Sequence, residues 1–459
     1  MENEKRSSFS GKIGFVLSAA GASVGLGNIW RFPYLAAKYG GGIFLLIYIV
    51  LALTFGYSMI VAETALGRMT GKSPVGAYAS FAKPGRRSGF LGFGGWINAI
   101  IPVLIVPYYS VIGGWVIQYL VGYLTGHGQE LAADGYFSSF ISDGAATEIC
   151  FLVFALFTLG IIFAGVRNGV ERVSKVMMPM LVVLSVIITA YSVTRPGALA
   201  GVKYFLVPNP ANFSWMTVVT AMGQMFYSLS IAMGILVTFG SYMKKDVSIE
   251  GATQNVEIFD TLIAIMAGLM IIPAVFAFSG GDPETLQAGP ALMFITIPKV
   301  FASMGYGTPA GILFFLLVLF AALTSSIALT ESAVSTFEDE LGWGRKKATI
   351  IVGIIMVVLG SLSSLGYGPL AFVKIIGMQF LDFFDFLTNS VMMPIAALTI
   401  CLLVSRKIGV EGIAEEVERE GAPFRRKRIF TFMIRYICPI FVAIILISSV
   451  ANVFGWISM

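Results

Sequence analysis

The chain has 459 residues, of which 57% are hydrophobic and only 12% charged, and its formal net charge is +5 at pH 7. Because an ordinary globular domain is about a quarter charged, this composition predicts a polytopic membrane protein and not a soluble domain. The cysteines Cys150, Cys401 and Cys438 lack metal-site spacing, and the single histidine, His127, stands in a polar loop. A disulfide framework, a zinc centre and histidine catalysis are therefore not indicated.

Long apolar stretches predict an all-α fold with eleven transmembrane helices, because about 20 apolar residues cross a bilayer. Their approximate limits are 13–38, 43–68, 90–124, 149–165, 169–194, 216–242, 254–280, 308–337, 348–366, 370–404 and 429–456. The expected organisation is a cytoplasmic N-terminal segment (1–12), a ten-helix core (13–404), a basic cytoplasmic loop (405–428) and an eleventh span (429–459).

Lysines and arginines indicate the orientation, because they concentrate in cytoplasmic loops. When the spans alternate in direction, most of the 30 basic residues fall on the same side as the N-terminus. We therefore expect a cytoplasmic N-terminus, and an odd number of spans places the C-terminus outside. The basic residues of these cytoplasmic loops account for the positive net charge, so no nucleic-acid partner is expected. Short loops indicate a bacterial inner membrane, with the lipid bilayer as surroundings.

Two spans are interrupted in the middle. The first contains GASVGLGN (21–28) and the sixth contains GQMFYSLSIAMG (223–234). Such interruptions at corresponding positions predict two inverted five-span repeats, about 13–194 and 216–404, with a binding site between them at mid-membrane. Helix N-termini there can bind an anion, and unwound carbonyls are ligands for a small cation. Glycines that serve only for close helix packing are the alternative.

Polar residues mark two further spans. The eighth contains AALTSSIALTES (321–332), although hydroxyls in membrane helices often bond to their own backbone. The seventh contains Asp260 inside an apolar run, and an ionisable residue at this depth indicates a functional site.

These stretches resemble the neurotransmitter:sodium symporters. GASVGLGNIWRFPY (21–34) followed by GGGIF is similar to the first-helix signature of that family. The resemblance continues through IVAETALGR (60–68), PYYSVIGGW (107–115), GQMFYSLS (223–230), LTSSIALTESAVSTFEDEL (323–341) and LDFFDF (381–386). It implies a five-plus-five inverted repeat in which helices 1 and 6 are unwound at mid-membrane. We expect eleven spans and no counterpart of the twelfth helix that is common in the family.

The resemblance implies one or two sodium ions. The first sodium site would comprise Ser23, Asn28, Ser228 and Asp260 with the substrate carboxylate, and the second Gly21, Val24, Ala321, Thr324 and Ser325. All of these are oxygen donors, as a hard cation requires. Family members commonly have asparagine where this chain has Asp260, and the glutamate position of some bacterial members falls on Ala264. The fixed carboxylate predicts transport without chloride, and protonation of Asp260 when sodium leaves is a further hypothesis.

The predicted substrate class depends on the absence of an aspartate in the first interrupted span. Gly25 stands where monoamine transporters carry an aspartate, so the substrate should bring its own carboxylate. The implied substrate-binding residues are Ser23, Leu26, Gly27, Ile105, Tyr109, Tyr227, Ser228, Ser230, Met233, Ser325 and Leu329. None of them would pair with a charged side chain, and burying such a charge unpaired is costly. A neutral, hydrophobic L-amino acid is the expected small-molecule substrate, and Met233 could repack around different sizes.

The resemblance also implies gates on both sides of the site. The implied residues are Arg31 and Asp385 outside, Arg6 and Asp339 inside with Phe9 and Tyr242 around them, and Gly169 and Pro179 for unwinding of the fifth helix. Proline removes one helical hydrogen bond, which favours that unwinding.

The predicted function is sodium-coupled symport by alternating access. A sensor that keeps the binding site without transport is the alternative. A channel would need a continuous polar pathway, whereas these polar residues converge on one cluster between two gates. An enzyme is not expected, because no span contains histidine and no serine and lysine stand at a plausible catalytic spacing.

Overall fold

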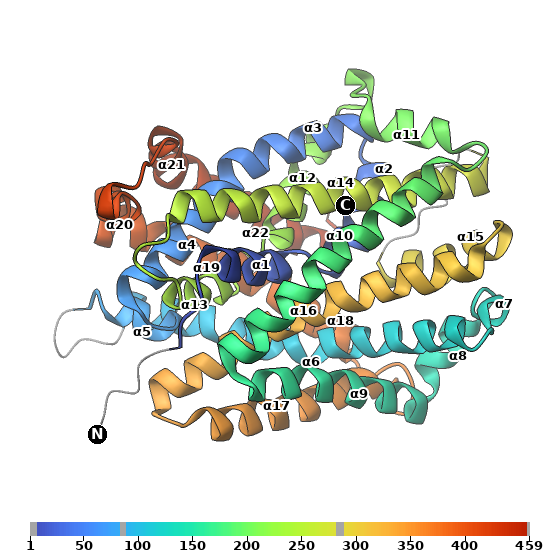
Figure 1. Cartoon of the computed structure of the whole chain (residues 1–459), viewed down its shortest axis with the longest axis horizontal. Coiled ribbons are helices and arrows are strands. Elements are labelled where there is room, and N and C mark those ends of the chain that lie inside the picture. Colours follow the sequence, from blue (N-terminus) through green and yellow to red (C-terminus); the bar gives the residue numbers. More distant parts are fainter. Residues whose placement is uncertain (1–6, 83–88, 281–288, 457–459) are drawn as a thin grey trace.

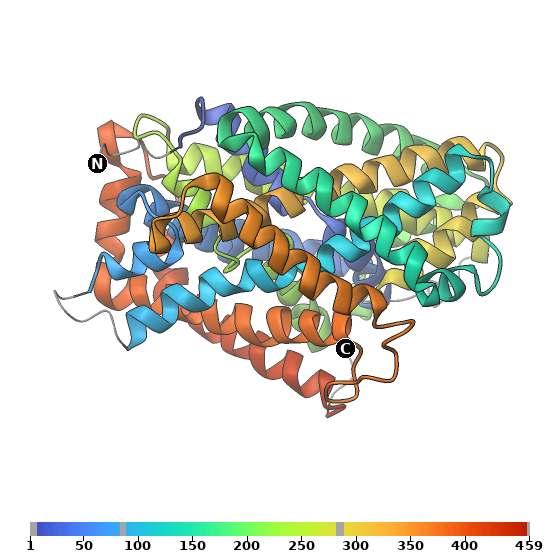
Figure 2. The same ribbon diagram turned by 90° about the horizontal axis from the view of Figure 1, so that it is seen from below.

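The computed structural model describes residues 7–82, 89–280 and 289–456. Helices account for most of this part of the chain, and the β-pairing within it consists of two isolated bridges. The long helices run side by side along the long axis of the molecule and form one bundle (Figures 1 and 2). The all-α prediction is therefore confirmed.

Nine helices of the described chain are long and apolar enough to cross a membrane. They are Gly42–Thr70 (α3, Gly42–Leu51, and α4, Tyr57–Thr70), α6 (Phe90–Leu124), α9 (Gly144–Phe163), Val166–Val193 (ending in α10, Arg172–Val193), α14 (Ile249–Ser279), α16 (Gly307–Leu341), α17 (Arg345–Leu365), Phe380–Ile408 (with α18, Phe380–Asp385, and α19, Met393–Leu402) and Lys427–Val453 (with α21, Lys427–Phe432, and α22, Cys438–Val453). Apolar side chains such as Leu156, Val183 and Ile447 are exposed, as expected for surfaces that contact lipid. The protein is thus a multi-pass membrane protein.

A helix break lies within each of the two interruptions read from the sequence, at 24–26 and at 229–234. α1 (Lys12–Ser23) and the helix Gly27–Lys38, which ends in α2 (Phe32–Lys38), are bent by 53° and together form one further candidate span. α12 (Trp215–Ser228) and α13 (Ile235–Ser241) are separated by a stretch in which Ser230 and Ala232 adopt positive φ angles of 53° and 58°. L-residues rarely adopt this backbone conformation, so the chain leaves the helix there.

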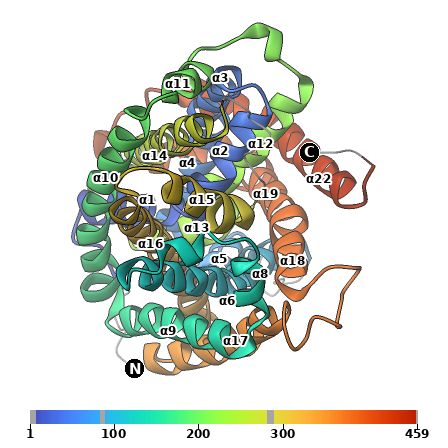
Figure 3. The same cartoon turned by 90° about the vertical axis from the view of Figure 1, so that its right-hand side faces the viewer.

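Short helices occupy both ends of the bundle (Figure 1). α5 (Pro74–Ala79) and α20 (Val410–Val417) lie at one end, together with α13 and α21. The opposite end holds α7 (Gly128–Leu131), α8 (Tyr136–Ser142), α11 (Ala198–Leu206) and α15 (Ile297–Ser303). Viewed along the bundle, α1 lies inside a ring of longer helices (Figure 3).

The predicted start of the tenth span at residue 370 is wrong. The helix begins only at Phe380, and a tight turn precedes it. Ile375 and Met378 form an isolated bridge, and Ile376 and Gly377 between them have φ angles of 53° and 79°. Hydrophobicity alone did not reveal this turn, because its residues are as apolar as those of the helix. The expected loop 405–428 likewise contains α20.

Glycines bring α4 and α13 into backbone contact. A Cβ atom at Gly67 would lie 1.9 Å from the carbonyl oxygen of Val237, and one at Gly240 would lie 2.4 Å from the carbonyl oxygen of Thr64. Neither neighbour is a flexible side chain, so the helices would have to separate to admit a methyl group. This contact fixes the position of α13, the helix that follows the second interruption.

Gly67→Ala should therefore destabilise the protein. Overpacking of this kind typically costs about 1–3 kcal/mol. The measurement is the thermal unfolding midpoint of the purified protein in detergent, followed by intrinsic fluorescence. Gly160→Ala in α9 is the matched control, since a Cβ atom there meets nothing within 4 Å. Equal midpoints for the two variants would contradict the packing argument.

Candidate functional site

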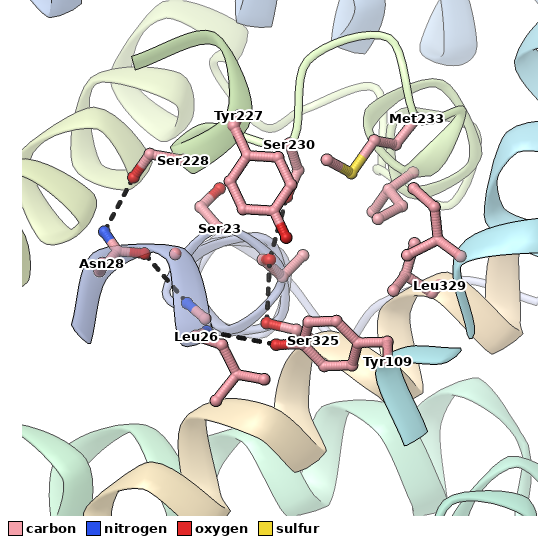
Figure 4. A pocket seen from close by; sticks show the side chains of 15 residues that line it. Ser23, Leu26, Asn28, Tyr109, Tyr227, Ser228, Ser230, Met233, Ser325 and Leu329 are labelled. Carbon is pink, nitrogen blue, oxygen red and sulfur yellow. Dashed lines mark hydrogen bonds between the residues drawn. The ribbon is translucent and has the colours of Figure 1, made fainter. Parts of the chain in front are cut away.

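A small cavity of about 30 Å³ lies where the two interruptions meet (Figure 4). Its lining consists of Ala22, Ser23, Gly25, Leu26, Gly27, Asn28, Ile105, Tyr109, Tyr227, Ser228, Ser230, Met233, Ile235, Ser325 and Leu329. All residues that the sequence suggested for substrate binding are in this set. The fold thus brings them together from α1, α6, α12, α16 and the two interrupted stretches, and their roles in binding stay predictions.

The cavity has a polar end and an apolar end. At the polar end, the Leu26 N–H donates to the Tyr109 hydroxyl over 3.3 Å, and the Gly25 N–H donates to Asn28 Oδ1 over 3.1 Å. In Figure 4, Met233 and Leu329 lie on the other side of the Tyr227 ring from Asn28 and Ser228. No charged side chain is in the lining. The lining therefore combines polar groups at one end with apolar side chains at the other.

Asp260 of α14 is fully buried beside the first interruption. Its carboxylate accepts hydrogen bonds from Asn28 Nδ2 (2.8 Å), Ser228 Oγ (2.9 Å) and the Tyr48 hydroxyl (3.0 Å). Among the described residues, no lysine or arginine neutralises this charge. Buried charges in proteins are paired or coordinate metals, so this carboxylate and its oxygen-bearing neighbours fit a sodium ion. Tyr48 was not anticipated from the sequence.

The second predicted sodium site lies between α1 and α16. The Ser325 hydroxyl lies 3.2 Å from the carbonyl oxygens of Gly21 and Ala22, and 3.4 Å from that of Val24. One hydroxyl hydrogen cannot serve three carbonyls, so lone pairs remain for a cation. Thr324 donates its hydroxyl to the Phe320 carbonyl over 2.9 Å, which leaves its own oxygen lone pairs available.

The carbonyl of Ala321, the remaining residue of that predicted set, lies 3.2 Å from the Thr324 hydroxyl. All five residues therefore lie close to one another. Their donor atoms are hydroxyl and carbonyl oxygens, which suit a hard cation. Binding of sodium there stays a prediction.

Glu63 of α4 contacts the second interruption and was not singled out from the sequence. This fully buried residue accepts the Ala232 N–H over 2.8 Å, so it ties α4 to the second interruption. Its other oxygen, Oε2, has no hydrogen-bond partner in the described part of the chain. The rule that pointed to Asp260, an ionisable residue inside an apolar span, could have found it. Gln224 links the two interruptions through a 3.0 Å bond to the Gly27 carbonyl.

A larger cavity of about 440 Å³ is also lined by Tyr227, and both predicted outer-gate residues, Arg31 and Asp385, line it as well. The Arg31 guanidinium lies 5.4 Å from the centre of the Tyr227 ring. Asp385 accepts a hydrogen bond of 2.6 Å from Asn389. Tyr227 lines both cavities and so lies at the boundary between them.

Two residues predicted for the inner gate, Phe9 and Tyr242, belong to an aromatic cluster, and closure of the site by this cluster stays a prediction. Phe9 is buried against Phe239 and Tyr242, with ring centroids 5.5 and 5.9 Å apart. The Tyr242 hydroxyl donates to Glu331 over 2.8 Å, and Arg345 donates to the same carboxylate. Neither Arg345 nor Glu331, a charged residue within the eighth span, was singled out from the sequence.

Of the predicted inner ion pair, Asp339 accepts the Ser73 N–H over 2.7 Å, and Arg6 lies outside the described residues. Gly169 belongs to the π-helical segment Val166–Glu171, and Pro179 lies inside α10. A Cβ atom at Gly169 would lie 2.0 Å from the Ile161 carbonyl oxygen, so packing against α9 also requires glycine there. The segment is helical in this structure, and its unwinding stays a prediction.

Comparison with known proteins identifies the family. The profile of the Sodium:neurotransmitter symporter family matches residues 6–132 and 136–456. The chain belongs to this family. It is therefore a sodium-dependent transporter and not an enzyme, and the resemblance read from the sequence is confirmed.

Relatives of this symporter cover nearly its whole length. It is 35% identical over 455 residues to the uncharacterized sodium-dependent transporter YhdH of Bacillus subtilis. The matched region covers 98% of this chain and 99% of YhdH. An uncharacterized sodium-dependent transporter of Haemophilus influenzae is 29% identical over 97% of this chain and 99% of its own length. The crystal structure of MhsT in complex with L-phenylalanine matches with a TM-score of 0.85 and 35% identity, covering 97% of this chain and 100% of MhsT.

Proposed function

We propose that this symporter carries neutral, hydrophobic L-amino acids together with sodium, without requiring chloride. The observation that carries the proposal is the small cavity with N–H groups at one end, apolar side chains at the other and no charged side chain in its lining. The substrate carboxylate would meet Leu26, Gly27 and Tyr109, while Ile105, Met233 and Leu329 would surround the side chain. The similarity to MhsT, which was crystallised with L-phenylalanine, supports this class of substrate.

Sodium coupling rests on the buried Asp260 cluster and on the oxygen atoms between α1 and α16. One or two ions would bind there. Asp260 supplies a fixed negative charge beside the first ion, so a chloride ion is not needed for charge balance. Each charge that moves inward down the membrane potential contributes about 2.3 kcal/mol per 100 mV, which can drive accumulation of a neutral substrate.

The topology that fits this mechanism has eleven spans in a cell membrane, with the N-terminus in the cytoplasm and the C-terminus outside. α12 and α13 would together form the sixth span, which completes a five-plus-five inverted repeat. Alternating access would proceed by closure of Arg31, Asp385, Tyr109 and Tyr227 on the outer side. Opening around Phe9, Tyr242 and Asp339, with unwinding near Gly169, would follow on the inner side.

Binding measurements test the substrate class. Radiolabelled L-phenylalanine should bind the purified protein in sodium and not in potassium. Excess L-leucine should displace it, whereas L-lysine and L-glutamate should not, because the cavity offers no partner for their side-chain charges. Displacement by L-lysine as strong as that by L-leucine would contradict the proposed class. A sensor, the alternative function, would pass this test but would not move the amino acid across a bilayer.

Thr324→Val should weaken sodium binding roughly tenfold or more, since even residues that only orient metal ligands contribute 10–100-fold in affinity. Valine keeps the shape of threonine but offers no lone pair. The measurement is the sodium concentration at half-maximal binding of L-phenylalanine. Ser326→Ala is the control, because the Ser326 hydroxyl instead pairs with Thr158 at 3.1 Å. An unchanged sodium requirement in Thr324→Val would remove Thr324 from the site.

A further inference from the structure

A basic cavity of about 710 Å³ lies at the start of the last membrane helix, away from the substrate site. It is lined by Glu411 of α20, by Arg425, Lys427 and Arg428, and by the aromatic residues Phe432 and Tyr436, among others. Three cationic side chains face one carboxylate, so the lining carries an excess of positive charge. α20 and α21 lie at one end of the bundle (Figure 1).

The basic run Arg425–Arg428 divides into paired and unpaired side chains. Arg426 turns toward the protein, where it pairs with Glu257 at 3.2 Å. Lys427 lies 3.1 Å from Glu411 and 3.3 Å from Glu418. Arg425 and Arg428 are exposed, and neither forms an ion pair with a described residue. Two guanidinium groups therefore remain available for an anion.

The backbone that presents these arginines is anchored. The buried Glu250 of α14 accepts the Arg425 N–H over 2.8 Å and the Arg426 N–H over 3.0 Å. Phe424 and Phe430 pack against each other with ring centroids 5.4 Å apart. Arg425 thus projects from an anchored turn, and Arg428 projects from the first turn of α21, which follows it directly. This anchoring lowers the entropy cost of binding a ligand between the two side chains.

Farther along the last helix, the lining of the cavity adjoins side chains that are exposed on the surface of the bundle. Arg428, Phe432 and Tyr436 recur every four residues and so share one helical face. Phe432 and Tyr436 are 55% and 54% exposed, with ring centroids 5.8 Å apart. The exposed Ile440 and Ile447 follow further along α22. Along this face, basic residues are followed by aromatic rings and then by aliphatic side chains. This order is expected where a helix enters a membrane.

We propose that this cavity binds an anionic phospholipid. Arg425 and Arg428 hold the phosphate through charge-assisted hydrogen bonds, and Phe432 and Tyr436 lie against the acyl chains. Charge complementarity and continuity with the lipid-facing surface both favour this occupant. A soluble phosphate would use the arginines but would have no contact with the aromatic wall.

Native mass spectrometry of the full-length protein in detergent tests the proposal. Phosphatidylglycerol and phosphatidylcholine with identical acyl chains are added separately, and the bound fractions are compared. The wild type should retain phosphatidylglycerol in preference to phosphatidylcholine. The double variant Arg425→Ala/Arg428→Ala should lose about tenfold or more in affinity for phosphatidylglycerol, because each basic residue near an anionic lipid contributes on the order of fivefold.

A matched double variant, Arg406→Ala/Lys407→Ala, removes the same charge from an exposed pair outside the cavity and should bind phosphatidylglycerol as the wild type does. Glu411→Gln should strengthen binding, since it removes the one carboxylate of the lining, and it keeps the proposal testable should the arginine variant fail to fold. Equal losses in both double variants, equal binding of the two lipids, or displacement of the lipid by inorganic phosphate would overturn the proposal.

Discussion

Gly25→Asp should abolish amino-acid uptake. A Cβ atom at Gly25 would lie 2.8 Å from the Ser325 hydroxyl oxygen and 3.0 Å from the Tyr109 hydroxyl oxygen, at the polar end of the cavity. The added carboxylate would occupy the place proposed for the substrate carboxylate and would repel it. Like charges in a buried interface cost several kcal/mol, so we expect a loss of about 100-fold or more.

The measurement is sodium-driven uptake of radiolabelled L-phenylalanine into proteoliposomes. Gly25→Ala serves as the control for volume, since it adds a methyl group without charge and should lose less activity. Binding of phenethylamine, which lacks the carboxylate, should appear or improve in Gly25→Asp. Uptake by Gly25→Asp within a few-fold of the wild type would show that the substrate carboxylate lies elsewhere.

Asp260→Asn should weaken sodium binding by about tenfold or more and make the sodium-dependent binding of L-phenylalanine respond to chloride. The substitution keeps the shape of the residue and removes a buried negative charge that has no cationic partner among the described residues. Without that charge, sodium would bind a neutral cluster, and an external anion would be needed for balance. Sodium titrations of L-phenylalanine binding, in chloride and in gluconate, measure both effects.

Glu257→Gln, on the same helix, is the control for Asp260→Asn. Its carboxylate pairs with Arg426 and lies outside the substrate cavity, so its loss should leave the sodium requirement unchanged. Were Asp260→Asn to keep both the wild-type sodium affinity and the indifference to chloride, Asp260 would be a packing residue, and chloride independence would need another source.

The two interruptions were predictable because glycine and serine runs inside an apolar span are unusual, and the structure has helix ends at Ser23 and Ser228. The tenth span was misplaced because apolar residues also form the turn around Gly377. Hydropathy reports the environment of a residue but not its backbone conformation. Turn geometry of this kind comes from local contacts that a pattern of apolar residues does not encode.

The residues of the site were predictable where a family motif covers them, and less so where a long-range contact defines them. Tyr48 reaches Asp260 across 212 positions of sequence, and Glu63 reaches Ala232 across 169. Neither partner can be read from local spacing. Glu63 nevertheless carried a signal, since a carboxylate inside an apolar span needs a partner. Applying that rule to every span would have marked Glu63 and Glu331 as candidate functional residues.

Sodium-driven accumulation of L-phenylalanine in proteoliposomes tests the central claim most directly. With an inward sodium gradient and chloride replaced by gluconate, the wild type should concentrate the amino acid inside, and a potassium gradient should produce no accumulation. Saturable, sodium-dependent binding without accumulation would contradict symport and would make the protein a sensor.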